Sequence, residues 1–109
     1  MKAQIDDAGG VFTLINTFHA PRDRQKAIVD SLRRFTEGFA RTLPGFIGAS
    51  VHMSLDGTRV VNYVQWKSGE DLRSMLATPE AQAHMAEVGA LADRVDPVPY
   101  AVAFVGTAE

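Results

Sequence analysis

The stretch from Val51 to Ser68, VHMSLDGTRVVNYVQWKS, decides the fold and carries the first indication of a site. Its centre, Asp56-Gly57, is a residue pair favoured in the tight turns that join antiparallel strands. The stretch therefore predicts a β-hairpin, with one strand over residues 46–54 and the next over residues 58–66.

Asn62 and Trp66 lie four positions apart in the second of these strands. Successive side chains in a strand alternate between faces, so both point the same way, with Val60 and Val64 around them. An amide donates and accepts hydrogen bonds, and an indole offers one N–H donor. Apolar walls with a few fixed polar groups suit a flat organic ligand. The alternative is a core tryptophan beside a hydrogen-bonded asparagine.

The hairpin register decides whether His52 joins this face. With a two-residue loop at Asp56-Gly57, His52 opposes Val61 and points away from the asparagine. With a three-residue loop, His52 opposes Val60 and points toward it. Aspartate at the middle position and glycine at the last position suit the longer loop, so we expect His52 to face the pocket.

Composition narrows the classes of function. The chain has 109 residues, enough for one small domain, with a net charge of −2 and an isoelectric point near 5.9. This charge gives no electrostatic basis for binding nucleic acid. The sequence has no cysteine, no glycine-rich phosphate loop, no paired metal-ligand spacing and no apolar run of membrane-spanning length. We therefore expect a cytoplasmic protein without metal or cofactor that binds neither nucleic acid nor membranes.

Patterning along the chain predicts one domain. We expect a flexible lead-in over residues 1–10, ending in Gly9-Gly10, and a folded domain over residues 11–107. Hydrophobic periodicity and the breaks at Gly and Pro predict a β-α-β-β-α-β order with the second helix in two pieces. This order indicates an α+β, ferredoxin-like fold with an antiparallel sheet. The expected strands are 11–19, 46–54, 58–66 and 100–106, and the expected helices are 23–42, 69–77 and 79–94.

Helices on one side leave the other face of the sheet uncovered. That face carries a set of small and apolar residues, Val11, Ile15, Val61, Tyr63, Ala101 and Ala103, or their register partners. An apolar sheet face in water is unfavourable and usually marks an interface. We therefore expect a homodimer packed sheet against sheet, forming a dimeric α/β barrel. A monomer is the alternative.

Three further polar residues are candidates for the site. Asn16 is a polar residue on the otherwise apolar face of the first strand, and a buried amide needs partners. It either lines the same cavity as Asn62 or bonds the backbone at the strand end. His19 ends a strand and His84 lies on the last helix, and we expect both to be solvated or capping residues.

The hairpin also identifies a relative. DGTRVVNYVQWKS, with Pro44-Gly45-Phe46 before it and TPEAQAHM after it, resembles the antibiotic-biosynthesis monooxygenase (ABM) family from about Val11 to Gly106. The resemblance implies a cofactor-independent monooxygenase that oxidises an anthrone, quinol or polyketide-like aromatic substrate with O₂ to a quinone. The alternatives are a non-catalytic dimeric barrel that binds a small aromatic molecule and a haem-degrading oxygenase of the same family.

Specific residues carry this resemblance. Asn62, Trp66 and His52 match catalytic positions of a family member, which implies that they stabilise a substrate anion, bond its oxygen and accept its proton. Leu72 and Met85 stand where that member has a pocket tyrosine and an arginine. The resemblance therefore places both in the substrate site and puts the identity of the substrate in doubt.

Haem-degrading members resemble this chain at Asn16, which we expect to bind the substrate as part of the cavity wall. They carry a tryptophan and a haem-ligating histidine where this chain has Met75 and Met85. His84 is one residue out of register, which rotates its side chain by about 100° around the helix. We therefore expect no haem.

Overall fold

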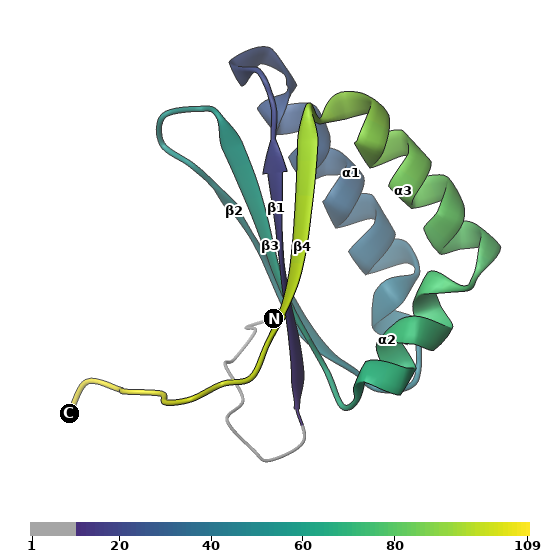
Figure 1. Cartoon of the computed structure of the whole chain (residues 1–109), viewed down its shortest axis with the longest axis vertical. Coiled ribbons are helices and arrows are strands. Elements are labelled where there is room, and N and C mark those ends of the chain that lie inside the picture. The colour runs from purple at the N-terminus through teal and green to yellow at the C-terminus, as the bar shows by residue number, and fades with distance from the viewer. Residues whose placement is uncertain (1–10) are drawn as a thin grey trace.

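The computed structural model describes residues 11–109, whose strands and helices follow the predicted β-α-β-β-α-β order (Figure 1). The lead-in predicted for residues 1–10 lies outside the described residues. One antiparallel sheet has the strand order β2-β3-β1-β4. Its strands are β1 (Phe12–His19), β2 (Phe46–Met53), β3 (Arg59–Trp66) and β4 (Arg94–Tyr100).

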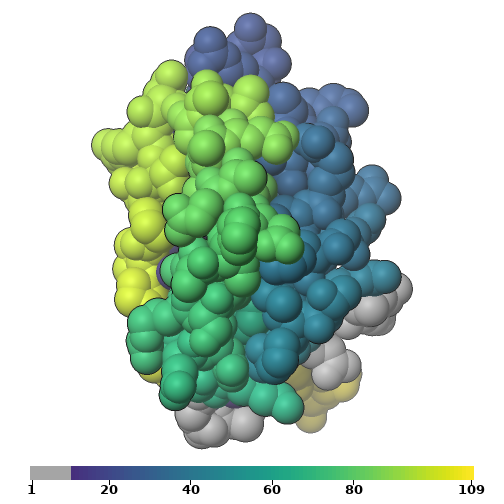
Figure 2. Space-filling model, turned by 90° about the vertical axis from the view of Figure 1, so that its right-hand side faces the viewer, coloured from purple at the N-terminus to yellow at the C-terminus, as the bar shows by residue number. Residues whose placement is uncertain are grey.

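The helices cover one face of this sheet (Figure 1). They are α1 (Gln25–Gly38), α2 (Gly69–Leu76) and α3 (Pro79–Leu91), and short 3₁₀ turns at Arg22–Arg24 and Ala40–Thr42 flank α1. Seen from this side, α3 in green and α1 in blue lie next to each other (Figure 2). The predicted α+β, ferredoxin-like fold is confirmed.

Helix starts follow the capping residues in the sequence. The Ser68 hydroxyl accepts a hydrogen bond from the Asp71 backbone N–H at 3.1 Å, which caps α2. The Thr78 hydroxyl accepts one from the Ala81 N–H at 3.2 Å, and Pro79 occupies the first turn of α3. These short polar side chains satisfy backbone donors that have no partner inside the helix. The predicted start of the last helix is therefore confirmed.

Two apolar clusters fill the space between sheet and helices. One is centred on Phe18, Ile28, Leu32, Val60 and Val88. The other contains Val64, Trp66 and Leu72, with Phe12, Leu14, Phe46 and Met75 packed against them. Members of both clusters line a cavity, so the site lies where the two clusters meet.

The last strand differs from the prediction. We expected a strand at residues 100–106 after a break at residues 96–99, but β4 runs from Arg94 to Tyr100 and contains Pro97 and Pro99. β4 is an edge strand that pairs only with β1, so every second backbone N–H points away from the sheet. Two prolines two positions apart are tolerated on that free side because no partner needs their missing N–H. Because β4 already begins at Arg94, α3 ends at Leu91 rather than near Arg94.

The sheet face opposite the helices carries apolar side chains among polar ones and is incompletely buried. The register places Ile15, Val61 and Tyr63 on this face, as predicted. Val98 and Tyr100 of β4 join them and are 41% and 50% exposed. Beyond β4 the chain leads away on the side opposite the helices (Figure 1). A single chain therefore leaves several apolar side chains of this face partly exposed to water.

Candidate active site

A cavity opens between the inner face of the sheet and the three helices. Its volume of about 290 Å³ lies near the lower end of the roughly 300–1,000 Å³ typical of small-molecule pockets. Most of the wall is aliphatic or aromatic. Five side chains that bear nitrogen or oxygen interrupt this wall: Asn16, Thr36, Asn62, Trp66 and His84.

Two asparagines lie side by side in the cavity wall. Asn16 of β1 and Asn62 of β3 are direct cross-strand partners, so their side chains leave the same face of the sheet. The Oδ1 atom of each is buried and has no hydrogen-bond partner within the described residues. An unpartnered buried acceptor lowers the stability of the protein without ligand, and it is available to accept a hydrogen bond from a ligand. Asn16 thus lines the cavity, the first of its two predicted environments.

Trp66 adds a donor to the same wall. Its side chain is almost fully buried, and its ring meets that of Phe46 edge to face with 5.4 Å between centroids. The indole Nε1 atom is buried without a hydrogen-bond partner in the described part of the chain. The predicted shared orientation of Asn62 and Trp66 is confirmed. The alternative of a core tryptophan beside a hydrogen-bonded asparagine does not apply, because Asn62 Oδ1 and Trp66 Nε1 both lack a partner within the described residues.

The expectation that His52 faces this pocket is wrong. In the observed register His52 opposes Val61, so it projects from the sheet face opposite Asn62. Its Nε2 atom lies 3.0 Å from the Ser50 hydroxyl, on the neighbouring position of that face. His52 therefore does not contribute to the cavity of its own chain.

The hairpin loop explains this register. The Ser54 N–H donates to the Arg59 carbonyl at 3.0 Å, which leaves four residues in the loop rather than three. Asp56 stabilises this longer loop, because its carboxylate accepts from the Thr58 backbone N–H, the Thr58 hydroxyl and the Ser54 hydroxyl. These hydrogen bonds lower the pKa of Asp56 to about 2. An even number of loop residues gives His52 the same partner as the two-residue loop does.

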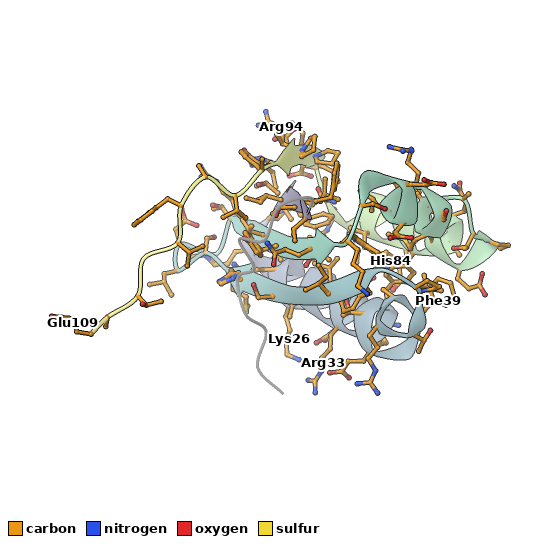
Figure 3. The ribbon with its side chains drawn as sticks, turned by 90° about the horizontal axis from the view of Figure 1, so that it is seen from below. Lys26, Arg33, Phe39, His84, Arg94 and Glu109 are labelled. Carbon is orange, nitrogen blue, oxygen red and sulfur yellow. The ribbon has the colours of Figure 1, made fainter. Side chains whose placement is uncertain are left out.

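His84, predicted to be solvated, instead lines the cavity. Its imidazole stacks on the Phe35 ring of α1, with centroids 4.2 Å apart and planes 3° apart. Figure 3 marks His84 on the helix side of the sheet. Burial lowers the pKa of His84 below its ordinary value of 6.5, while Glu87 raises it and Arg34 lowers it further. The imidazole is therefore neutral at neutral pH.

Helical spacing is the signal that could have found His84. Ala81 and Val88 are the buried residues of α3, and His84 lies three positions after one and four before the other. Positions with this spacing share a helix face. The resemblance assigned the neighbouring Met85 to the site instead, and Met85 is 44% exposed while still bordering the cavity.

Leu72, which the resemblance assigns to the substrate site, also borders the cavity. Leu72 comes from α2, is buried in the cluster around Trp66 and lines the cavity. With Met85 on α3, it gives this part of the wall an apolar character. Neither residue offers a strong hydrogen-bonding group to a ligand.

Across residues 11–109, no three side chains of His, Cys, Asp or Glu gather in a group suited to holding a metal ion. No helix in the same range is both long and apolar enough to cross a bilayer.

Sequence comparison identifies the family. Residues 11–87 match the sequence profile described as antibiotic biosynthesis monooxygenase. The chain belongs to the antibiotic biosynthesis monooxygenase family. A curated relative, tetracenomycin-F1 monooxygenase of Streptomyces glaucescens, is 43% identical over 82 residues, which cover 75% of this chain and 73% of that protein. These matches confirm the predicted family and the predicted monooxygenase function.

Solved structures of the antibiotic biosynthesis monooxygenase type share the fold. The ActVA-Orf6 monooxygenase of Streptomyces coelicolor, in complex with nanaomycin D, superposes with a TM-score of 0.82 at 26% identity over 90% of this chain and 92% of that one. SnoaB of Streptomyces nogalater, described as a cofactor-independent oxygenase, gives 0.74 at 21% identity over 89% of this chain and 97% of that one. These similarities support the predicted βαββαβ arrangement.

Proposed function

We propose that this monooxygenase oxidises an aromatic, polyketide-like anthrone or quinol with O₂ to a quinone, without flavin, haem or metal. One observation carries the proposal: an apolar cavity holds a buried donor, Trp66 Nε1, and two buried acceptors, the Oδ1 atoms of Asn16 and Asn62, none with a partner among the described residues. A hydroxylated polycyclic ketone presents hydroxyl donors and carbonyl acceptors on a flat apolar frame. The relatives point to the same chemical class, since one is a tetracenomycin-F1 monooxygenase and another binds nanaomycin D.

The chemistry follows from what such a substrate does by itself. An anthrone that loses a proton becomes an electron-rich anion, which transfers an electron to O₂ directly. The protein has to hold the ring, stabilise the anion and keep water away. The Trp66 indole N–H donates to a substrate oxygen, and the Asn62 amide N–H donates to the oxygen on which negative charge develops. Apolar walls from both core clusters exclude water.

Oxygen uptake with dithranol, a 1,8-dihydroxyanthrone, tests this function. The assay contains chelator and no added flavin or haem, and the spontaneous rate is subtracted. We expect O₂ consumption together with the absorbance of the anthraquinone product. Uptake no faster than the spontaneous reaction with dithranol and with a hydroxylated naphthol would overturn the proposal.

Trp66→Phe keeps most of the ring and removes the N–H donor. We expect kcat to fall by up to about 10²-fold, the effect typical of one transition-state hydrogen bond, while circular dichroism stays unchanged. Tyr63→Phe is the matched control, because it removes one polar group from an aromatic ring on the same strand but on the opposite face. Equal rates for Trp66→Phe and wild type would assign Trp66 to packing alone.

We also infer that two chains associate through the sheet face opposite the helices. Support comes from the apolar residues that this face presents, among them Val61, Val98 and Tyr100. Phe104, in the segment that leaves the body of the molecule on this side, is 84% exposed. Burial of such surface against a second copy would give the dimeric barrel expected from the sequence.

A further inference from the structure

One side chain in the cavity wall can exchange a proton near neutral pH. The lining residues of the described chain include no Asp, Glu, Lys, Arg, Tyr or Cys, and His84 is their sole titratable member. The proposed oxidation begins with loss of a proton from the substrate. Among the described residues that line the cavity, His84 is therefore the one side chain that could accept this proton, with water as the other acceptor.

The surroundings of His84 hold the imidazole ready for this role. Stacking on Phe35 fixes the plane of the ring and leaves its edge, with both nitrogens, unblocked by the stack. Neither nitrogen forms a hydrogen bond with any residue in the described range. Ala81 and Val88 share the helix face of His84 and are buried. This face of α3 is therefore directed at the sheet that carries Asn62 and Trp66.

We propose that His84 is the base that takes the proton from the aromatic substrate, an inference that rests on the proposed function. In dithranol a C–H bond of the central ring breaks, the proton goes to an imidazole nitrogen and the electron pair stays on the ring. The carbanion adds O₂ to give a peroxide anion, which regains the proton from the imidazolium. Loss of the second C–H proton and cleavage of the O–O bond then yield the ketone and water.

The charges around His84 are consistent with a neutral base that is protonated only transiently. Arg34 on α1 and Glu87 on α3 are the charged groups that act on it, and they form an ion pair with 2.7 Å between Arg34 Nη2 and Glu87 Oε1. Because burial lowers the pKa of His84, the neutral form that accepts protons dominates at pH 7. Glu87 favours the imidazolium once it forms.

His84→Gln tests the base, because glutamine keeps hydrogen-bonding capacity and does not titrate. For wild type, kcat/KM with dithranol should fall as pH drops below the ordinary histidine value of 6.5, since protonation removes the base. For His84→Gln we expect a loss on the order of 10²–10⁴ in kcat, the usual contribution of a general base, and no such acid limb. Added imidazole should restore part of the rate of His84→Ala. His52→Gln, on the opposite sheet face, is the control and should keep the wild-type profile.

Two readouts separate this inference from the proposed function. If wild type oxidises dithranol and His84→Gln matches its rate and pH profile, the role of His84 is overturned and the function stands. If wild type does not oxidise dithranol or the naphthol, the function itself falls. Should His84→Gln not fold, NMR of wild type decides: 1,8-dihydroxyanthraquinone should shift the His84 ring resonances and its pKa, and unchanged signals would overturn the inference.

Discussion

Asn62 illustrates at the scale of a single residue how the site conflicts with the stability of the fold. Its Oδ1 atom is buried beside that of Asn16 without a hydrogen-bond partner in the described chain. An unsatisfied buried polar atom costs about 1–3 kcal/mol, and replacement by an apolar group of similar shape relieves that cost. A packed core has no reason to keep such a pair, whereas a site that binds a hydrogen-bonding ligand does.

Asn62→Leu should therefore stabilise the free protein while it removes activity. We expect a higher melting temperature by an amount equivalent to about 1 kcal/mol, together with a large loss of turnover. Differential scanning calorimetry without ligand and the oxygen assay measure the two effects. Val61→Leu, the neighbouring position on the opposite face, shows the effect of adding an aliphatic group elsewhere on β3. A lower melting temperature for Asn62→Leu would mean that the amide stabilises the sheet.

The two histidines show why single residues are harder to place than elements. The face of His52 depends on whether the hairpin loop has an odd or an even number of residues, since one residue of shift moves a strand side chain to the other face. The hydrogen bonds of Asp56 decide the matter, and they come from side chains of the loop itself. His84 shares a helix face with Ala81 and Val88, but α3 carries small or apolar residues around most of its circumference, so spacing alone did not show which face is buried.

At the scale of the elements, capping and turn residues predict where helices and turns begin better than helix and strand propensities do. Thr78-Pro79 marks the start of α3, and Asp56-Gly57 marks the hairpin, because these residues satisfy specific backbone groups or backbone angles. The position of β4 was not predictable in this way. Its prolines indicate a break in most contexts, and they fit here only because β4 lies at the sheet edge, which depends on the order of all four strands.

Gly45, directly before β2, packs against the start of α2, the helix that carries Leu72 in the cavity wall. It has a positive φ of 86°, and a side chain there would collide with the Asp71 carboxyl at the start of α2. Gly45→Ala should destabilise the protein by more than about 1 kcal/mol, since it adds a steric clash to a strained backbone angle. Gly38→Ala is the control, because nothing lies within 4 Å of the added methyl group. Urea unfolding measures both, and equal midpoints would show that the loop before β2 adjusts freely.

At the scale of the whole molecule, the sequence predicts the layers better than the cavity. Hydrophobic periodicity identifies which faces of the helices and strands are buried, so one helical layer on one sheet follows directly. The cavity depends on where the clusters around Phe18 and Trp66 leave space between them, which reflects the packing of side chains from every element. No local pattern contains that information.

The uncovered sheet face leads to the last prediction, which concerns assembly. Val61 lies near the middle of this face, between His52 of β2 and Thr17 of β1 in the register. A charge there would be buried without a partner in a sheet-to-sheet dimer, and an unpaired buried charge costs several kcal/mol. In light scattering at micromolar concentration we expect wild type to have the mass of two chains and Val61→Asp to have that of one.

Ala83→Asp is the matched control for this charge, because Ala83 is exposed on α3, on the opposite side of the molecule. It should leave the dimer intact. The cavity lies on the helix-covered side of the sheet, within one chain, so a folded Val61→Asp monomer should still bind 1,8-dihydroxyanthraquinone in fluorescence titrations. A wild-type mass of one chain, or a Val61→Asp protein that remains dimeric, would contradict association through this face. Loss of binding with the fold preserved would instead mean that the site depends on the second chain.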